Sequence, residues 1–360
     1  MNGMTLVAVL TLLIAPPGAA QERVDGGLNV ASGLILPQVG QQKPQPPPAP
    51  PPPPPADGVK RRGSFVGYID DAVVASKLRV RFEAGFENQV PDRVEFFYAK
   101  CGCYRDLPEG EALRDPDSPG PGPGAANDLN FQQVYIQGEV RLGNRLSLFG
   151  EFPLRWIQPQ AFFGPSLGGG EGFSDQSGLS DIRVGVKAEI VSTPAQVLTV
   201  QVRGYLPTGD SEKGLGTDHA TIEPALLMYH RIGDSASVES QVGLWYPLGG
   251  ADGLPITADE KFSAPVLYYG IGPSVEVYRS SRVRFGPVVE LVGWHLTGGF
   301  QSFPPDDDEV DASGVNIVNI KFGARLTWND TDTIYGGWGR GLTDRKWYRD
   351  LIRVEYRRTF

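Results

Sequence analysis

The sequence predicts an all-β protein: an antiparallel transmembrane β-barrel of about twelve strands, preceded by a signal peptide and a Pro-rich disordered segment. Three observations support this fold class. Apolar and charged residues alternate along many short segments, the connections between them alternate between short and long, and the chain ends on an aromatic residue, Phe360. Only every second residue of a barrel strand faces lipid, so the mean hydropathy of -0.22 is compatible with this fold.

Residues 1–20 have the pattern of a secretory signal peptide. Residues 5–15 form an apolar run, and the small residues Gly18 and Ala20 stand at positions −3 and −1 of a cleavage site before Gln21. The first five residues depart from the pattern because they contain no Lys or Arg. A buried N-terminal helix is the alternative. This apolar run is too short to span a bilayer, and no later run reaches the roughly 18 apolar residues that a transmembrane helix needs. The sequence therefore excludes a helical transmembrane protein.

Residues 21–77 are expected to form a periplasmic Pro-rich linker that is mostly disordered. Residues 43–57 read KPQPPPAPPPPPPAD, a composition that favours a stiff, solvated polyproline II conformation. A plain spacer is one interpretation, and a ligand for a partner is the other. The basic residues at 60–62 are expected to be solvated.

The barrel is expected to occupy residues 78–360. In its first strand, Leu78, Val80 and Phe82 lie on one face, and charged residues lie on the other. Such a period of two is typical of a strand with two different environments. The pattern predicts strands at 78–88, 129–142, 146–156, 179–191, 197–207, 221–231, 236–247, 266–278, 283–296, 315–328, 333–341 and 350–360.

The predicted connections alternate in length, as they do between the periplasmic turns and extracellular loops of outer-membrane barrels. The short ones are 143–145, 192–196, 232–235, 279–282 and 329–332. The longer ones are 89–128, 157–178, 208–220, 248–265, 297–314 and 342–349. A soluble β-sandwich, the alternative, gives no reason for this alternation. An even strand count returns Phe360 to the periplasmic side, where the last strand is expected to pair with 78–88 and to be read by the barrel-assembly machinery.

Aromatic residues are expected at the two membrane interfaces. Trp156, Trp245, Trp294 and Trp338 fall near the outer ends of their strands, and Trp328 falls near an inner end.

The charged residues opposite the apolar rows are predicted to line the lumen. They are Arg79, Arg81, Glu83, Glu139, Arg141, Glu151, Arg155, Asp181, Arg183, Lys187, Arg203, Glu239, Glu276, Arg284, Glu290, Lys321 and Arg325. Two interpretations stay open. The charges either pair with one another and fill the barrel, or they line a narrow polar conduit.

The stretch 178–217 is the most specific part of the sequence. It resembles the outer-membrane transporter family of the meta-pathway of phenol degradation in three pieces: 178–185 (GLSDIRVG), 206–210 (LPTGD) and 213–217 (KGLGT). Asp218 stands where this family usually has glycine. The resemblance implies a barrel over about 78–360 and transport of small, often aromatic molecules.

The same stretch contains a loop motif: Thr208, Gly209, Asp210, Lys213, Gly214 and Gly216. Its glycines permit tight turns, and Asp210 can bond to its own loop backbone. Such a loop either caps the rim or folds inward to narrow the pore.

The remaining motifs give little chemistry. Cys101 and Cys103 are expected to form a disulfide in the oxidising envelope, since two cysteines alone cannot complete a zinc site. The acidic run 306–309 is expected to be solvated, with cation-bridged lipopolysaccharide as the alternative. We expect no metal site, no cofactor and no nucleic-acid partner, the last because the net charge is -9.

These observations predict passive passage of a small solute across the outer membrane of a Gram-negative bacterium, and the resemblance implies that the solute is aromatic or hydrophobic. Outer-membrane lipid, the assembly machinery and the solute are the expected partners. A structural barrel with a filled lumen, whose loops or Pro-rich arm bind a partner, is the alternative. A hydrolase at the rim is a further one, but His219, His230 and His295 show no pairing with a nucleophile in sequence, and we expect no enzymatic activity.

Overall fold

The computed structural model describes residues 63–90, 98, 100–105, 107–111, 114–163, 172–250, 252–254, 257–301 and 310–360. The predicted signal peptide, the Pro-rich tract and the acidic run 306–309 lie outside these residues.

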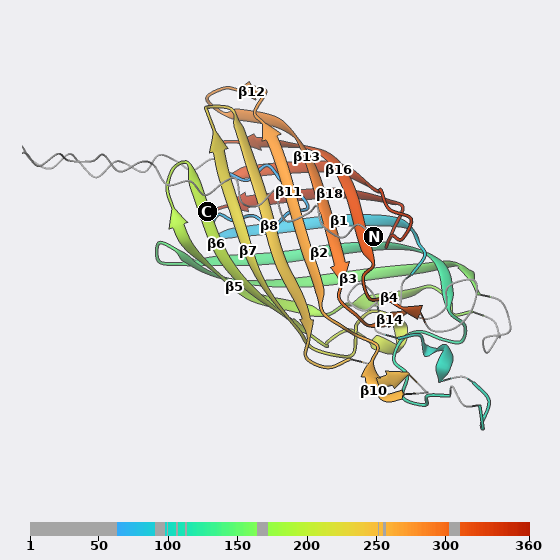
Figure 1. Ribbon diagram of the computed structural model, residues 1–360. Coiled ribbons are helices and arrows are strands. Elements are labelled where there is room, and N and C mark those ends of the chain that lie inside the picture. The colour runs from blue at the N-terminus through green and yellow to red at the C-terminus, as the bar shows by residue number, and fades with distance from the viewer. Residues whose placement is uncertain are drawn as a thin grey trace, which may run out of the picture. The chain divides into compact units, whose positions relative to one another are not determined.

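The described residues form a closed antiparallel β-barrel of twelve long strands (Figure 1). Each strand pairs with its neighbours in sequence, and the pairing of β11 with both β8 and β13 completes the ring. The strands are β1 (Lys77–Asn88), β2 (Ala126–Leu142), β3 (Leu146–Phe162), β5 (Ile182–Ser192), β6 (Gln196–Leu206), β7 (Thr221–Ile232), β8 (Ala236–Pro247), β11 (Val266–Val275), β13 (Val283–Leu296), β16 (Asn316–Trp328), β17 (Asp332–Gly341) and β18 (Asp350–Thr359).

Short elements decorate this ring. β4 (Gln176–Leu179) pairs with β3, and β12 (Tyr278–Arg279) pairs with β13. Two small sheets are formed by β9 (Asp252–Leu254) with β10 (Thr257–Lys261) and by β14 (Phe300–Gln301) with β15 (Val310–Asp311). There are also two 3-10 helices in the described residues, η2 (Gly102–Tyr104) and η3 (Ser211–Lys213). Within the described residues no helix is long and apolar enough to cross a membrane.

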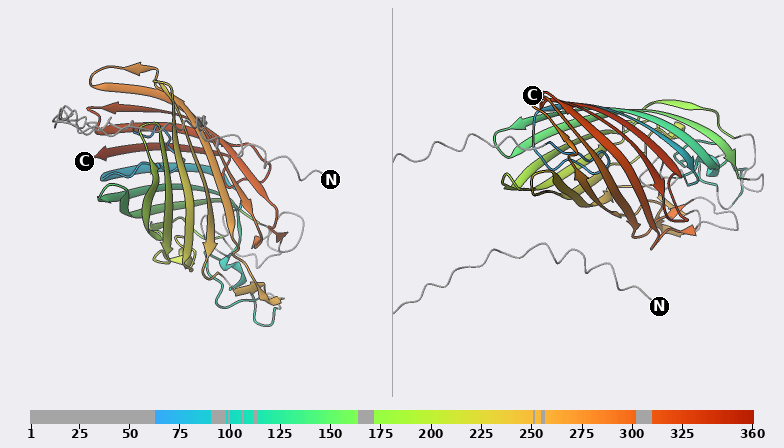
Figure 2. Two further views of the ribbon diagram at one scale, coloured as in Figure 1. Left: turned by 60° about the vertical axis from the view of Figure 1, so that its left-hand side comes forward. Right: turned by 90° about the horizontal axis from the view of Figure 1, so that it is seen from above.

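The first and last strands close the barrel, as the sequence predicts. β1 pairs with β18 from Lys77 opposite Thr359 to Phe86 opposite Asp350, and the Phe360 N–H donates to the Ser76 carbonyl at 2.9 Å. The rim that carries Phe360 is called the short-turn rim, and the opposite one the long-loop rim. Figure 2 shows the long strands running between the two rims.

The outer surface of the barrel carries an apolar belt. On β18, Ile352 and Val354 point outward with exposed fractions of 43% and 49%, and β1 and β3 expose Phe82 and Phe152 in the same way. A belt of this extent is unfavourable in water and suits the acyl chains of a bilayer. The fold is therefore a membrane-spanning barrel of the outer-membrane type.

Two predicted strand bounds are wrong for a visible reason. The predicted strand 179–191 is divided between β4 and β5, because the Ser180 N–H bonds to the Pro153 carbonyl and the Asp181 side chain turns toward a loop. The strand predicted to end at 156 extends to Phe162, because β2 pairs with it as far as Ala126.

The tryptophans divide between two environments. Trp156 and Trp338 face outward, and Trp328 is half-buried near the outward Tyr356, as an interfacial belt requires. Trp245 and Trp294 do not belong to that belt. They point into the lumen, where both lie against Trp347.

The apolar belt predicts a depth-dependent cost for charge on its surface. Val354→Arg should lower the free energy of unfolding by about 2–4 kcal/mol, because it places a cation within the hydrocarbon region. Arg358→Leu should change it by about 1 kcal/mol or less, because Arg358 already lies outward near the short-turn rim with 54% of its side chain exposed. Equilibrium unfolding in lipid vesicles measures both; equal effects would contradict the assigned membrane position.

Candidate functional site

The lumen wall holds a network of buried ion pairs. Glu151 of β3 accepts from Arg183 at 2.8 Å, Arg79 at 3.4 Å and Arg81 at 3.5 Å. Glu355 of β18 likewise accepts from Arg325 and Arg357, each at 2.9 Å. Arg79 and Arg81 of β1 reach Glu151 past β2, and Arg325 of β16 reaches Glu355 past β17. Arg183 stands opposite Glu151 on the neighbouring strand β5, and Arg357 lies on β18 itself. The pairs therefore run along the inner face of the wall.

The structure places the predicted lumen residues as follows. Arg79, Arg81, Glu83, Glu139, Glu151, Arg155, Asp181, Lys187, Glu239, Glu276, Glu290, Lys321 and Arg325 are buried, Arg183, Arg203 and Arg284 are half-buried, and Arg141 is exposed at the short-turn rim. Arg141 bonds there to the carbonyls of the turn at Gly143 and Asn144 instead of entering the lumen.

Residues 63–76, which precede β1, run inside the barrel. We call them the plug. Two wall carboxylates hold its backbone: Glu239 accepts from the Phe65 N–H at 3.0 Å, and Glu290 accepts from the N–H groups of Gly67, Tyr68 and Ile69 at 3.1, 2.8 and 2.8 Å. Backbone amides that would be unsatisfied inside the barrel therefore meet charged acceptors, which form strong hydrogen bonds.

Wall donors satisfy the plug carbonyls in turn. Arg325 donates to Val66 at 2.7 Å, Lys187 to Asp71 at 2.9 Å and Thr199 to Ala72 at 2.5 Å.

The plug's two acidic side chains are paired as well. Asp70 meets Arg203 at 2.5 Å, and Asp71 meets Lys77 at 2.9 Å and Arg357 at 3.1 Å. The wall thus supplies partners for N–H groups and carbonyls of the plug backbone and for both of its carboxylates.

Glycine residues make room for the plug on both sides. A Cβ atom on Gly272 of β11 would lie 2.7 Å from a methyl carbon of Val66, and one on Gly67 of the plug itself would overlap the Tyr335 ring. The wall is therefore shaped to receive this segment.

Composition predicts that residues 63–76 belong to the linker, whereas the structure places them in the lumen. The signal was present, because Phe65, Val66, Ile69, Val73 and Val74 give this stretch an apolar content that a solvated spacer does not need. No period of two reveals it, since the plug is not a strand.

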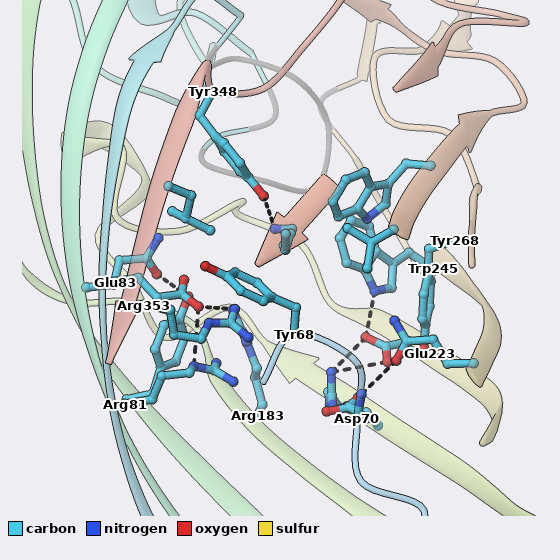
Figure 3. A pocket seen from close by; sticks show the side chains of 18 of the residues that line it. Tyr68, Asp70, Arg81, Glu83, Arg183, Glu223, Trp245, Tyr268, Tyr348 and Arg353 are labelled. Carbon is cyan, nitrogen blue, oxygen red and sulfur yellow. Dashed lines mark hydrogen bonds and ion pairs between the residues drawn. The ribbon is translucent and has the colours of Figure 1, made fainter. Parts of the chain in front are cut away.

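A chamber of about 150 Å³ lies between the plug and the long-loop rim (Figure 3). Tyr68 and Asp70 of the plug form part of its wall. The barrel contributes aromatic and charged side chains: Arg81, Glu83, Phe131, Tyr135, Arg155, Arg183, Arg203, Tyr205, Glu223, Trp245, Tyr268, Trp294, Lys321, Tyr348 and Arg353.

Glu223 organises one side of this chamber, as Figure 3 shows. It accepts from the Trp245 indole N–H at 2.6 Å and the Tyr268 hydroxyl at 2.7 Å, and it pairs with Arg203 at 3.2 Å. Trp245 and Tyr268 are thereby fixed in orientation, with their ring centroids 5.6 Å apart.

A second, wider space of about 650 Å³ lies at the short-turn rim. Gly63 and Lys77, which bound the plug in sequence, both line it, together with Asp71, Asn329 and Phe360. The plug therefore separates this vestibule from the chamber, and it enters and leaves the lumen at the same rim.

The chamber is closed toward the long-loop rim by an apolar cluster. Trp347, in the loop between β17 and β18, stacks on Trp245 at 6.0 Å between ring centroids and meets Trp294 at 4.7 Å. Tyr98 and Ile157 belong to the same cluster.

The loop motif at 208–217 folds over this rim. Asp181 holds it by accepting from the backbone N–H groups of Thr208 at 3.1 Å, Gly209 at 3.0 Å and Thr217 at 2.9 Å. Asp210 pairs with Lys213 on the exposed side at 2.6 Å. Gly216 packs against Asp181, and the Gly214 carbonyl accepts from Arg155 of the chamber at 3.4 Å. The motif thus caps the rim and also touches the lumen.

The long insert carries the cysteine pair. Cys101 and Cys103 form a disulfide, and both are buried with Tyr104 and Ala125 in a small apolar cluster. Gly214 lies against Tyr98, so the insert and the loop motif contact each other over the chamber.

Two of the three histidines, His219 and His295, have side-chain hydrogen-bond partners. The His219 Nδ1–H donates to the Thr217 carbonyl at 2.8 Å, and burial lowers the pKa of its imidazole below the ordinary value, so the ring is neutral at pH 7. His295 bonds through Nδ1 to the Asn316 side chain at 2.9 Å. Among the described residues, no group of three His, Cys, Asp or Glu side chains is arranged to hold a metal ion.

No protein-family model matches this sequence, and no curated protein sequence matches it. The transporter family named above therefore stays a prediction.

Solved structures with similar folds include the COG4313 outer membrane channel from Pseudomonas putida F1, at 14% identity and a TM-score of 0.48, covering 82% of this chain and 99% of that one. The beta domain of the Bordetella autotransporter BrkA has 14% identity and a TM-score of 0.44, and the match covers 79% of this chain and 100% of that one. The Pseudomonas putida toluene transporter TodX has 10% identity and a TM-score of 0.39, and the match covers 79% of this chain and 90% of that one. The assignment of an outer-membrane barrel rests on this chain's own geometry.

Glu290→Gln should loosen the centre of the plug selectively. An amide oxygen accepts more weakly than a carboxylate by about 1 kcal/mol, so the amides of residues 67–69 should exchange roughly fivefold faster with solvent. Glu189→Gln is the matched control, because Glu189 accepts from the Val74 N–H at 3.0 Å and should affect only that end. Amide exchange resolved by NMR measures both; unchanged rates at 67–69 would contradict the assigned anchor.

Proposed function

We propose that this protein is an outer-membrane channel for passive passage of a small solute, and that the plug holds it closed. The observation that carries the proposal is the position of the plug between two cavities, the chamber and the vestibule. A segment of the protein's own chain lies between these cavities, held by hydrogen bonds and ion pairs to the wall and by the packing of Val66 and Ile69 in an apolar cluster.

The geometry allows the plug to withdraw. Gly63 and Lys77 both line the vestibule, so the segment can leave through the short-turn rim without being threaded through the barrel. Water can replace the hydrogen-bond partners of its backbone once the lumen hydrates. Opening also exposes the apolar side chains that the plug buries, among them Val66, Ile69 and Ala72, and this cost favours the closed form.

The chamber favours a small, flat solute. Its walls present the rings of Tyr68, Trp245, Tyr268, Trp294 and Tyr348. Aromatic walls with a few fixed polar groups suit an aromatic ligand, which agrees with the transporter resemblance of residues 178–217. The solute's own gradient would drive passage.

We further propose that the short-turn rim faces the periplasm of a Gram-negative bacterium and that the preceding linker lies there. The last strand, with Phe360 beside Ser76, is then the segment offered to the barrel-assembly machinery.

A filled structural barrel is the second candidate. The density of ion pairs on the lumen wall, such as Glu151 with three arginines, favours it. In that case the plug is permanent, and partners bind to the loops or to the Pro-rich arm.

Removing both plug anchors separates the two candidates. The double variant Glu239→Ala/Glu290→Ala should raise ion conductance in planar bilayers and solute entry in liposome swelling by several-fold, because the two carboxylates hold the backbone from Phe65 to Ile69. Glu276→Ala is the control, since Glu276 is equally buried but pairs with Arg279 and Arg284.

The folded state of each variant is checked by its heat-dependent mobility on a detergent gel. A correctly folded double variant that stays silent, and a variant lacking 63–76 that also stays silent, would exclude the channel and support the filled barrel.

A further inference from the structure

One cation in the chamber differs from the others in its partners. Lys321 of β16 is only 2% exposed, and within the described residues no carboxylate lies within 4.0 Å of its ammonium group. Its Nζ donates to the Tyr348 hydroxyl at 2.6 Å and lies 3.9 Å from the centre of the Tyr68 ring.

The other five chamber cations have different partners. Arg81 and Arg183 pair with Glu151, and Arg203 pairs with Asp70 and Glu223. Arg353 pairs with Glu83, and Arg155 donates to the Gly214 carbonyl at 3.4 Å.

Glu83 and Glu290 act on Lys321 only from a greater distance. Each of them has nearer partners, Arg353 for Glu83 and the plug amides for Glu290. An ammonium carries three donors, so Lys321 retains donor capacity toward the chamber.

The chamber surface has an excess of positive charge. Six cationic side chains line it, against the three carboxylates Asp70, Glu83 and Glu223. In an enclosed space such an excess favours an anionic ligand group, and a buried ammonium without a carboxylate is its natural partner.

The size and lining of the chamber define the rest of the ligand. A volume of about 150 Å³ is comparable to an apolar protein cavity that accommodates one benzene molecule. The Trp294 ring lies 5.9 Å from the Lys321 ammonium, and Tyr68 and Tyr348 flank it, so a ring next to the carboxylate would meet aromatic faces.

We infer that the chamber binds a small aromatic carboxylate whose anionic group is held by Lys321. This inference rests on the proposed function and names the class of solute for the same site.

Lys321 also joins the two closures of the chamber. Tyr348 follows Trp347 in the loop that closes the long-loop rim, and Tyr68 belongs to the plug, as Figure 3 shows for the two tyrosines. Directly opposite Lys321 in the sheet stands Glu290, the main anchor of the plug. A carboxylate on Lys321 competes with the Tyr348 hydroxyl and weakens the cation–π contact with Tyr68, so it loosens both closures together.

Calorimetric titration of the full-length refolded protein with sodium benzoate and with benzyl alcohol tests the site. Wild type should bind benzoate saturably. Lys321→Met should weaken benzoate binding on the order of tenfold or more, since a charge-assisted hydrogen bond is lost, and should leave benzyl alcohol binding unchanged.

Lys321→Arg keeps the charge and should keep benzoate binding. Lys213→Met is the matched control, because Lys213 is an exposed lysine that pairs with Asp210 away from the chamber. Absence of benzoate binding to wild type, or an equal loss of benzoate and benzyl alcohol in Lys321→Met, would overturn the inference. If Lys321→Met does not fold, wild type alone decides: benzoate binding no tighter than benzyl alcohol binding would overturn the inference.

The link to the closures has its own measurement. Benzoate should speed amide exchange at residues 67–69 in wild type and not in Lys321→Met; equal exchange with and without benzoate would refute the link. Failure of this inference is distinguishable from failure of the channel. If the plug variants conduct ions but the protein does not bind benzoate, the channel proposal stands and the carboxylate site is refuted. If the protein binds benzoate but no variant conducts, the carboxylate site stands and the channel proposal is refuted.

Discussion

Buried carboxylates that need partners determine the arrangement of this molecule. An isolated charge inside a barrel is costly, so each lumen carboxylate must meet donors. Glu151 and Glu355 meet arginines from several strands. Glu239 and Glu290 make no ion pair among the described residues, and the backbone amides of the plug satisfy them instead. The wall therefore contains acceptors whose partners come from residues 63–76, and the barrel and the plug are one structure in the closed form.

The width of the barrel explains why such a segment is needed. Twelve strands enclose more space than an eight-stranded barrel, whose side chains fill its interior, and less than an open porin. Ion pairs fill part of this space, and the plug fills the middle. The room for it is built into the wall, where Gly272 accommodates Val66 and Gly286 faces Phe65. In the proposed channel the closed form is the ground state, and passage would require an excursion in which water takes over the plug's hydrogen bonds.

The sequence predicts those parts of the fold where the environment changes with every residue. Lipid outside and polar partners inside impose the period of two, so the strand count and the closure of β1 on β18 follow from sequence. The plug could not be predicted in this way, because its partners are side chains far along the chain, such as Glu290 for Tyr68. For Trp245, the residue type predicts the aromatic belt at the membrane interface. The alternation along its strand instead places it on the lumen face, where Glu223 binds its indole N–H. The break at Asp181 was hidden because a charged residue at a lumen position also fits an uninterrupted strand.

A passive channel with a plug also needs a reason to open for one solute and not for others, and the structure offers one. A ligand shifts an equilibrium between two forms only if it binds one of them better. In the closed form, Lys321 shares its ammonium between Tyr348 of the outer closure and Tyr68 of the plug. Once either closure moves away, the same ammonium is free of that contact and binds an anion more strongly. A carboxylate in the chamber therefore favours the forms in which the closures have moved, whereas a neutral ring, which fits between the same aromatic walls, gains nothing from their departure.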